Sequence, residues 1–410
     1  MAKCLICGQA IEHFISFGKM PIANGFVTPA EFKDEYFFEL KTGVCPKCLM
    51  VQLTELVDSE KLFHDNYAYF SSISTRMARH FEDFARHVMN DFGFSLGKDG
   101  FVVELGSNDG IMLRHFASAG IRHLGVEPSG NVAAAATKQG VNTVCKFFGR
   151  DFAGEILSGH GRADAILAAN VMCHIPDLHS VFDGVKSLLK PRGILAFEDP
   201  YLCDIIEKTS YDQIYDEHVY YFSAHSVSRL AAMHGLELID VEPQTTHGGS
   251  MRYVIAHQGA RSVSHNVEGR LAYERALKIE SSETYAGLSR KIFRSRDQLV
   301  DLLEKAKAGG KRVAGYGATS KSTTVFNFCG IGPDLIEFIT DTTPTKIGKT
   351  TPGMHIPVVP YEHFKNNRPD YALLLAWNHG EEIMAKERAF VEQGGRFMTF
   401  VPEVRIIGEC

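Results

Sequence analysis

Residues 101–110, with the sequence FVVELGSNDG, constrain the fold more than any other stretch of the chain. An apolar run ends at Glu104-Leu105 and passes through Gly106 and Gly110 into the amphipathic residues 111–119. A buried parallel strand that turns tightly into a helix is typically written this way. The glycines allow close backbone approach to a ligand, and the helix start supplies free N–H groups. The stretch predicts a ligand site at this turn; an ordinary strand–turn–helix unit is the alternative.

The glycine spacing argues against a dinucleotide at this turn. A dinucleotide site has the pattern G-x-G-x-x-G, whereas this turn reads E-x-G-x-x-x-G with Asn108 between the glycines. The next strand-like run, residues 122–128, ends in Glu127, whose carboxylate could accept hydrogen bonds from two ribose hydroxyls. The pattern therefore favours a ligand that contains a ribose and needs no phosphate cradle.

The length and the charge of the chain limit the classes of protein it can belong to. A chain of 410 residues is expected to form two or three domains. The formal charge of −6 gives no basic footprint for nucleic acid. No apolar run reaches the roughly 18 residues of a membrane span, and the first residues lack a secretory signal. We expect a cytoplasmic protein whose nine cysteines are thiols or metal ligands.

Two C-x-x-C pairs open and close the N-terminal section. Cys4, Cys7, Cys45 and Cys48 offer four thiolates, enough to fill a tetrahedral zinc shell. Residues 8–44 between the pairs exceed the usual spacing of such sites, so a small subdomain is expected there. Four protein ligands leave no position for water, which predicts a structural rather than a catalytic metal. The alternative is a set of unrelated thiols or a redox pair.

An aromatic and hydroxyl-rich segment, residues 66–74, precedes a helix predicted near residues 75–92. The helix places Met77, Phe81, Phe84 and Val88 on one stripe, which we assign to the core. Tyr67 and Tyr69 lie in the irregular segment, where packing and ligand contact are equally good interpretations.

Strand-like runs then alternate with helical stretches. The further runs are residues 142–148, 163–171 and 193–199, and residues 178–189 read as a helix. This alternation predicts a doubly wound, mostly parallel sheet whose ligands lie beyond the carboxyl ends of the strands. The residues at those ends include Glu104, Glu127, Phe148 and Asn170. Residues 237–243 and 250–257 read as a closing antiparallel hairpin.

The insert at residues 211–222 is rich in titratable groups. Tyr215, Glu217 and His218 form the candidate catalytic group. Histidine has the intrinsic pKa of a general base near neutrality, and a neighbouring carboxylate could orient it. A satisfied histidine in a polar loop is the alternative. The later turn HGGSMR places His247 and Arg252 as candidate acceptor contacts, with a plain hairpin loop as the alternative.

The C-terminal part begins with helices predicted within residues 267–308 and continues as a second α/β unit. Its strand-like runs are residues 335–341, 371–376 and 396–401. Glycines at 315 and 317 are followed by Ser320 and Lys321 at a helix start, where N–H groups and a cation converge on an anion. Asp341 ends the next strand, where dinucleotide folds place a ribose acceptor.

Together these motifs resemble the sugar C-methyltransferases, S-adenosylmethionine-dependent enzymes that methylate C-3′ of dTDP-4-keto-deoxysugars. The resemblance covers nearly the whole chain and rests on the cysteine pairs and the segments 104–110, 215–218, 247–252 and 315–321. It implies a zinc-binding module at residues 1–70, a class I methyltransferase domain at 71–260, and a helical linker with a Rossmann-like sugar-nucleotide domain at 261–410.

The resemblance also assigns residues to ligands. The expected donor-site residues are Glu104, Gly106, Asn108, Gly110, Glu127, Pro128, Phe148, Asn170 and His174. The expected substrate-site residues are Tyr67, Ser71, His247, Arg252, Ser320, Lys321, Thr324, Asn327 and Asp341, with residues 320–324 read as a diphosphate site.

The chemistry expected of this family suits the insert. Removal of the C-3′ proton gives an enolate stabilised by the C-4′ oxygen, with His218 as base and Glu217 holding it. The hydroxyl of Tyr215 or Tyr69 could hydrogen-bond the oxyanion. We expect a monomer that binds a nucleotide sugar, S-adenosylmethionine and structural Zn²⁺, without nucleic acid or membrane. The alternatives are an NAD-dependent sugar-nucleotide oxidoreductase or epimerase, and an O- or N-methyltransferase of a small metabolite.

Overall fold

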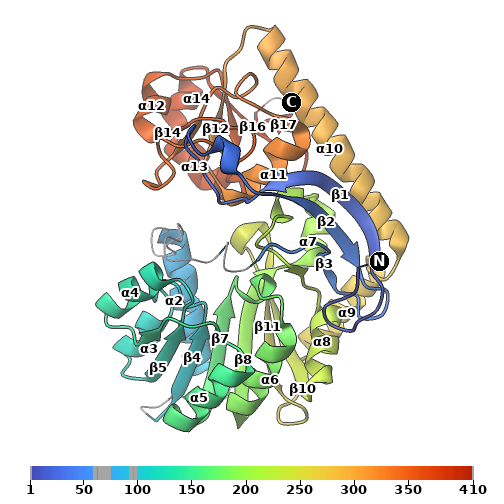
Figure 1. The fold of residues 1–410 in the computed structure, drawn as a ribbon, viewed down its shortest axis with the longest axis vertical. Coiled ribbons are helices and arrows are strands. Elements are labelled where there is room, and N and C mark those ends of the chain that lie inside the picture. The colour runs from blue at the N-terminus through green and yellow to red at the C-terminus, as the bar shows by residue number, and fades with distance from the viewer. Residues whose placement is uncertain (1, 59–61, 63–74, 92–95, 97–98, 409–410) are drawn as a thin grey trace.

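The computed structural model describes residues 2–58, 62, 75–91, 96 and 99–408 of the chain (Figure 1). A four-stranded N-terminal sheet, a seven-stranded central sheet and a six-stranded C-terminal sheet organise these residues. The candidate residues Tyr67, Tyr69 and Ser71 lie outside the described residues. Among the described helices, none is long and apolar enough to cross a membrane.

The central sheet is doubly wound, as the alternation of strands and helices predicts. Its order is β10-β11-β8-β7-β4-β5-β6, parallel from β8 to β6, while β11 runs antiparallel to both of its neighbours. The strand order reverses at β4, and ligands of such sheets bind at that reversal. The strands are β4 (Phe101–Leu105), β5 (Arg122–Val126), β6 (Thr143–Val144), β7 (Ala163–Ala169), β8 (Leu189–Pro200), β10 (Leu236–Gln244) and β11 (Ser250–His257).

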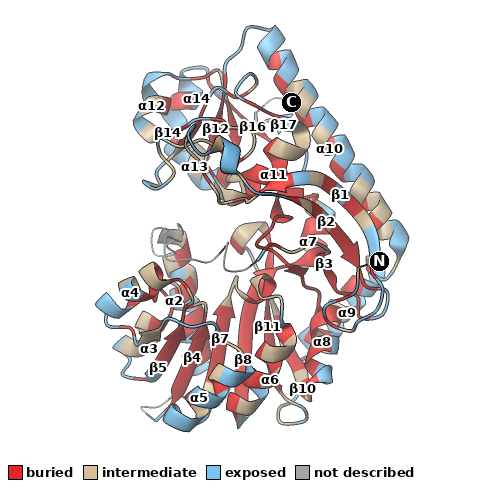
Figure 2. Ribbon diagram, in the orientation of Figure 1, coloured by how far each residue is buried: buried red, intermediate tan, exposed pale blue. Residues whose placement is uncertain are grey.

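Helices cover both faces of the central sheet, because successive residues of a strand point to opposite faces. Val102 of β4 packs in one buried cluster with α2, α3 and α4, whereas Val103 and Leu105 pack in another with α5, α6 and α8. Figure 2 shows the strands of this sheet as buried. The helices are α2 (Thr75–Asn90), α3 (Leu113–Ser118), α4 (Gly130–Lys138), α5 (Arg150–His160), α6 (Leu178–Leu188), α7 (Leu202–Lys208) and α8 (Ala224–Met233).

The apolar stripe predicted for the helix near residues 75–92 is confirmed. The stripe of α2 is buried at Met77, Phe81, Phe84 and Val88. Helix α8 begins with a capping box in which the Ser223 side chain accepts from the Ser226 backbone N–H.

The N-terminal sheet joins the cysteine segment to the distant insert. Its order is β1 (Glu12–Pro21), β2 (Phe37–Val44), β3 (Val51–Leu53) and β9 (Tyr220–Tyr221), all antiparallel. The short helix η1 (Phe32–Asp34) lies between β1 and β2. Strand β9 follows directly on the insert residues Tyr215–His218, so the N-terminal sheet holds one end of the candidate catalytic segment.

The C-terminal sheet has the order β14-β13-β12-β15-β16-β17, parallel from β14 to β16, with β17 antiparallel to β16. Helices α9 (His265–Ala276) and α10 (Ser282–Ala308) precede it, and Figure 1 shows α10 running along β1. The strands are β12 (Val313–Tyr316), β13 (Ile339–Asp341), β14 (Val358–Pro360), β15 (Tyr371–Leu374), β16 (Arg396–Thr399) and β17 (Arg405–Ile406). The helices are α11 (Ser320–Cys329), α12 (Tyr361–Asn366), α13 (Gly380–Lys386) and α14 (Arg388–Glu392).

Two predicted strands are less than half as long in the structure. The run 142–148 keeps only β6, an edge strand that pairs with β5 alone before the chain turns toward a cavity. The run 335–341 keeps only β13, because the N–H groups of Leu335 and Ile336 donate to the carbonyl of Gly332 in a local turn. Apolar composition predicted strand there, and the local turn hydrogen bonds override it.

Candidate active site

A cavity of about 480 Å³ lies at the carboxyl ends of the central strands. Other parts of the chain complete its walls: the insert, the loops of the C-terminal sheet, helix α2, the turn at His247, and Asn24 from the turn after β1. This volume is in the range of small-molecule sites. The sequence predicted ligand loops on two sheets, and the structure brings both loops to one cavity.

The loop after β4 adopts a left-handed backbone at three positions, Gly106 (φ +59°), Asn108 (φ +49°) and Gly110 (φ +80°). A Cβ atom at Gly106 would lie 2.4 Å from the side chain of Val171, so only glycine fits there. Asparagine is one of the few other residues that visit this conformation readily, which explains Asn108 at a middle position. Gly106 and Asn108 line the cavity, while Gly110 closes the turn behind them.

Glu127 accepts hydrogen bonds from the loops after β4 and β5 and lines the cavity. Its Oε2 accepts the Asn108 N–H at 2.9 Å and its Oε1 accepts the Ser129 N–H at 2.8 Å. Burial raises the pKa of Glu127, while these two N–H groups favour the charged form. Each oxygen has a further lone pair, so the carboxylate can still accept hydrogen bonds from a ligand beside Pro128.

Glu104 lies beneath this loop and is not on the cavity wall. It is 3% exposed, and its Oε2 has no hydrogen-bond partner among the described residues. Burial, with the nearby carboxylates of Glu127 and Asp109, raises the pKa of Glu104 well above its usual range. The structure therefore places Glu104 as a support under the loop.

The wall beside β6 and β7 is partly aromatic. Phe147 is 55% exposed and, with Phe148, lines the cavity. Asn170 follows β7 with φ +57°, and its N–H donates to the Glu198 carbonyl at 2.7 Å. The short helix η3 (Met172–His174) comes next and brings the His174 imidazole to the wall. A flat apolar face next to an amide is suited to a nucleobase.

His218 is held as a neutral imidazole with a defined tautomer. Its Nδ1 lies 2.9 Å from the carbonyl oxygen of Gln213, which can only accept, so Nδ1 carries the proton. Its Nε2 is then a lone-pair nitrogen, and the Tyr215 hydroxyl lies 2.9 Å from it. Burial, together with His174 and Lys321, lowers the pKa of His218 well below its usual range. The arrangement presents a base on the cavity wall.

The expected role of Glu217 in orienting His218 is corrected by this geometry. Both ring nitrogens of His218 are already engaged, by Gln213 and Tyr215, so a backbone carbonyl orients the ring. Glu217 is 5% exposed and lines the cavity. Burial lowers the pKa of Lys346, and the negative charges of Asp341 and Glu217 act in the opposite direction.

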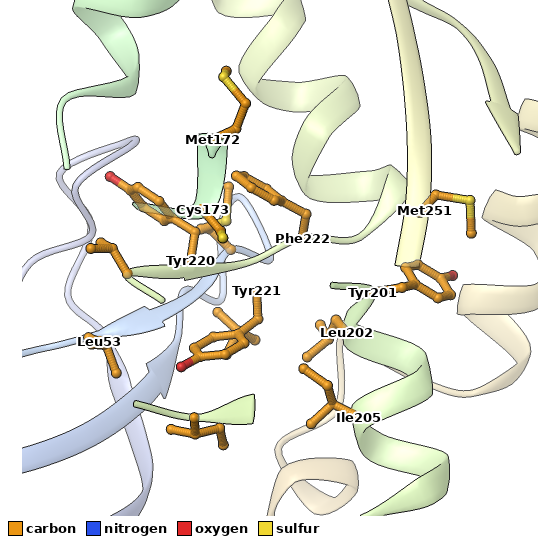
Figure 3. Close-up of a cluster of buried hydrophobic side chains, with 14 of the residues drawn as sticks. Leu53, Met172, Cys173, Tyr201, Leu202, Ile205, Tyr220, Tyr221, Phe222 and Met251 are labelled. Atoms are coloured by element: carbon orange, nitrogen blue, oxygen red, sulfur yellow. The ribbon is translucent and has the colours of Figure 1, made fainter. Parts of the chain in front are cut away.

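A buried cluster beneath the insert fixes its position. Figure 3 shows Leu53 of β3, Met172 and Cys173 of η3, and Tyr220 to Phe222 gathered in one group. The hydroxyl of Tyr220 donates to the Pro176 carbonyl at 2.6 Å. The ring centroids of His174 and His218 lie 5.2 Å apart, and burial lowers the pKa of His174 to about 4. Two neutral imidazoles therefore lie side by side at the site.

The C-terminal loop after β12 contributes the cations. Ser320 and Lys321 line the cavity at the start of α11, and Lys346 lines it from the segment after β13. Burial lowers the pKa of Lys321, while Asp212 acts in the opposite direction. The Nζ of Lys346 donates to the Ala318 carbonyl at 2.9 Å. Asp341 accepts the N–H groups of Ala318 and Thr343 at 2.6 and 2.7 Å, which fixes both loops.

Three predicted substrate residues lie away from the cavity wall. Arg252 forms ion pairs with the buried Glu198 and with Glu242, since a buried guanidinium needs carboxylate partners. The Thr324 hydroxyl donates to the Ile214 carbonyl at 2.7 Å, and the Asn327 amide donates to backbone carbonyls of Thr323 and Pro352. The structure places these side chains in domain packing. His247 does line the cavity, with φ +53° and a pKa lowered by burial to about 3.

The four cysteines of the two pairs meet as predicted. Their sulfur atoms all lie within 4.8 Å of one another, with Cys4–Cys48 at 3.4 Å and Cys7–Cys45 at 3.3 Å, and all four are free thiols. A zinc tetrahedron with Zn–S bonds of about 2.3 Å has sulfur–sulfur edges of about 3.8 Å, so the cage fits zinc. A second group, Cys173, His174 and His218, has both His218 nitrogens hydrogen-bonded, and we assign no metal there.

Several cavity residues could not be found from sequence motifs. Lys346, Asn378, His379 and Asn24 line the cavity, and each comes from a loop without a recognisable pattern. Long-range contacts bring them in: for example, the Arg76 side chain donates to the Asn378 carbonyl at 3.1 Å. Only Lys346 had a local signal, as a lysine five residues after the acidic strand end Asp341.

Comparison with known proteins identifies three family segments. Residues 245–402 match the family described as "C-methyltransferase C-terminal domain", residues 77–241 match "Methyltransferase domain", and residues 4–63 match "Putative zinc binding domain". The chain is 36% identical over 408 residues to C-methyltransferase NovU of Streptomyces niveus, which covers 99% of this chain and 96% of that protein.

Solved methyltransferase structures align with part of the chain. A S-adenosylmethionine-dependent methyltransferase from Clostridium acetobutylicum is 12% identical, with a TM-score of 0.34, over 44% of this chain and 92% of its own. The magnesium protoporphyrin IX methyltransferase of Synechocystis is 12% identical, with a TM-score of 0.35, over 49% and 92%.

Proposed function

Because the chain belongs to the C-methyltransferase family, we propose that it methylates C-3′ of a nucleotide-linked 4-keto-deoxysugar. S-adenosylmethionine is the methyl donor of this family's chemistry. The observation that carries the proposal is the His218–Tyr215 pair on the wall of a cavity shared by both glycine loops. A carbon can attack a methyl group only as a carbanion equivalent, so a base beside a hydrogen-bond donor is the feature that this reaction requires.

The donor site is the loop after β4. Glu127 would accept the ribose hydroxyls on its remaining lone pairs, and Phe148 with Asn170 would hold the adenine. The backbone at Gly106 and Asn108 would lie along the ligand without a side-chain clash. When bound, S-adenosylmethionine supplies an electrophilic methyl group on a positively charged sulfur.

The base is His218. Its Nε2 would remove the C-3′ proton, leaving electrons that the C-4′ oxygen of the ketone takes up as an enolate. The imidazolium formed is stabilised by the Gln213 carbonyl, which accepts the Nδ1 proton at 2.9 Å. C-3′ would then form the new carbon–carbon bond to the methyl group as the methyl–sulfur bond breaks, with the sulfur leaving as a neutral thioether. The protein's remaining task is to align the two ligands.

The Tyr215 hydroxyl would stabilise the oxyanion. In the structure it donates to His218 Nε2, and protonation of that nitrogen frees the hydroxyl for the enolate oxygen. A preorganised donor of this kind contributes about 3 kcal/mol to the transition state. Tyr69 remains a second candidate for this role and lies outside the described residues.

The acceptor's diphosphate would bind the C-terminal side of the cavity. The start of α11 at Ser320 lies on this side of the cavity wall, as do both of the wall's lysines, Lys321 and Lys346. The nucleotide that we propose is dTDP. Ammonium groups at a helix start are a general solution for phosphate binding.

Zinc is proposed as a structural ion bound by Cys4, Cys7, Cys45 and Cys48. Metal analysis of the purified protein should give one zinc per chain. Protein that folds and turns over without zinc would contradict this assignment.

Deuterium wash-in tests the reaction directly. Incubation with dTDP-4-keto-deoxysugar in D₂O without methyl donor should exchange the C-3′ proton, and addition of S-adenosylmethionine should place the methyl on that carbon, as read by NMR. Methylation of a hydroxyl or amine with no exchange at C-3′ would contradict C-methylation and favour a heteroatom acceptor.

A further inference from the structure

The segment between the two cysteine pairs reaches the active site, although neither zinc binding nor catalysis requires its length. Strand β1 runs from the cysteine cage to α11, as Figure 1 shows, and the chain turns there at residues 22–25. The Gly25 N–H donates to the Ile22 carbonyl at 3.1 Å and closes that turn. The turn therefore lies where the N-terminal, central and C-terminal parts meet.

Ala23 fixes this turn from both sides. Its N–H donates to both carboxylate oxygens of Asp216, at 3.1 and 3.2 Å, and its carbonyl accepts the Thr323 hydroxyl at 2.8 Å. Asp216 directly precedes Glu217 and His218 in the insert, and Thr323 belongs to α11. Ala23 is 1% exposed. The backbone of the turn is thus held at a fixed distance from both the base and the helix that begins with Ser320.

The next residue, Asn24, lies on the wall of the cavity. Its side-chain Oδ1 is buried and has no hydrogen-bond partner among the described residues. On its other side, the Lys346 ammonium lies 4.6 Å from the centre of the Phe26 ring. A buried carbonyl oxygen without a partner destabilises the protein, and a ligand that donates a hydrogen bond to this oxygen would remove that cost.

We propose that Asn24 is a specificity residue for the acceptor, and that its carboxamide oxygen accepts a hydrogen bond from a hydroxyl of the nucleotide-linked sugar. This inference rests on the proposed function. The sugar, rather than the nucleotide, is the donor because Ala23 is tied to the residue next to Glu217 and His218, where the reacting ring must lie. The N-terminal module thereby selects the sugar as well as binding zinc.

Binding of three ligands to one variant tests the proposal. Asn24→Leu keeps the shape of the side chain but removes the acceptor. In calorimetry the variant should bind the dTDP-linked keto sugar about 5- to 10-fold more weakly than the wild type does. Its affinities for dTDP and for S-adenosylhomocysteine should be unchanged, and the latter shows that the donor site is folded.

A second variant addresses the turn itself. Thr323→Val removes the hydroxyl that holds the Ala23 carbonyl, and it should weaken binding of the keto sugar nucleotide in the same direction without affecting dTDP. Unchanged affinity of Asn24→Leu for the sugar nucleotide, or an equal loss for dTDP, would overturn the proposal. Failure of the wild type to bind any nucleotide-linked keto sugar would instead overturn the proposed function.

Discussion

The loops after β4 and β12 share a strand–loop–helix topology and an acidic residue that holds the loop, and they differ in the charges around them. Each has a glycine with positive φ after the first strand, Gly106 at +59° and Gly317 at +90°. Each has an acidic residue at the end of the second strand, Glu127 or Asp341, which accepts one N–H from each of two loops. Identical topology and hydrogen bonding therefore occur twice around one cavity.

The charges distinguish the two loops. Carboxylates surround the first loop, with Glu104 and Asp109 buried near Glu127. Both lysines on the cavity wall lie on the side of the second loop, Lys321 at the start of α11 and Lys346 in the segment after β13. A carboxylate-rich loop suits a donor that carries a sulfonium, and a lysine-rich loop suits a diphosphate. The comparison teaches that the turn geometry provides a place for a ligand and that the nearby charges choose its class.

The largest predicted effect belongs to a residue on neither loop. His218→Asn removes the base, and we expect kcat to fall by about 10³-fold, in the range of general-base catalysis. Both ligands should still bind, because their loops are intact. Stopped-flow turnover with S-adenosylmethionine and calorimetry with each ligand measure the two effects.

The matched control is Tyr215→Phe, which keeps His218 and removes only the hydroxyl at 2.9 Å from its Nε2. We expect a smaller loss of kcat, of about 10²-fold. Near-normal turnover of His218→Asn would exclude His218 as the base and would leave the two loops without a catalytic group between them.

The next effect tests the second loop. Lys321→Met keeps the length of the side chain and removes its charge, which should weaken binding of dTDP about 30-fold, or about 2 kcal/mol for a lost charge-assisted contact. The exposed Lys307, paired with Asp334 at 3.1 Å, is the control, and Lys307→Met should bind dTDP normally. Equal affinities in both variants would show that Lys321 does not contact the diphosphate.

The next effect is on stability rather than on turnover or binding, and it concerns His174 on the cavity wall. The pKa of His174 is about 4 in the folded chain, whereas that of an unfolded histidine is about 6.5. As the pH falls below 6.5, the unfolded chain binds a proton at this histidine and the folded chain does not. The free energy of unfolding therefore decreases. His174→Asn lacks that titration.

The stability difference between wild type and His174→Asn should therefore shrink by about 2 kcal/mol from pH 7 to pH 5. Urea unfolding of both proteins at both pH values measures this difference. A stability difference that does not change with pH would mean that His174 binds its proton as readily in the folded chain as in the unfolded chain.

Local sequence predicted much of this molecule, for a physical reason. The strand–turn–helix at residues 101–119 and each of the two C-x-x-C pairs are formed by residues close together in the sequence, so periodicity and spacing reveal them. The short run of β6 and the ion pairs of Arg252 depend on partners far along the chain. Lys346 and Asn24 carry no motif, because only the tertiary fold brings their loops to the cavity.

Glu217 illustrates the same limit. Its position next to His218 suggested that Glu217 orients the imidazole. In the structure the Gln213 carbonyl accepts the hydrogen bond from Nδ1 instead, because side chains adjacent in sequence point in different directions. Sequence proximity predicted the members of the group and could not predict the pairing.

Calorimetry with two variants tests the division between the loops most directly. S-adenosylhomocysteine and dTDP are titrated into Glu127→Gln, whose amide group would face the N–H of Asn108 or Ser129, and into Lys321→Met. The account predicts crossed losses: Glu127→Gln weakens S-adenosylhomocysteine at least about 10-fold and spares dTDP, and Lys321→Met does the reverse. Loss of both ligands in either variant, or weakened S-adenosylhomocysteine binding in Lys321→Met alone, would contradict it.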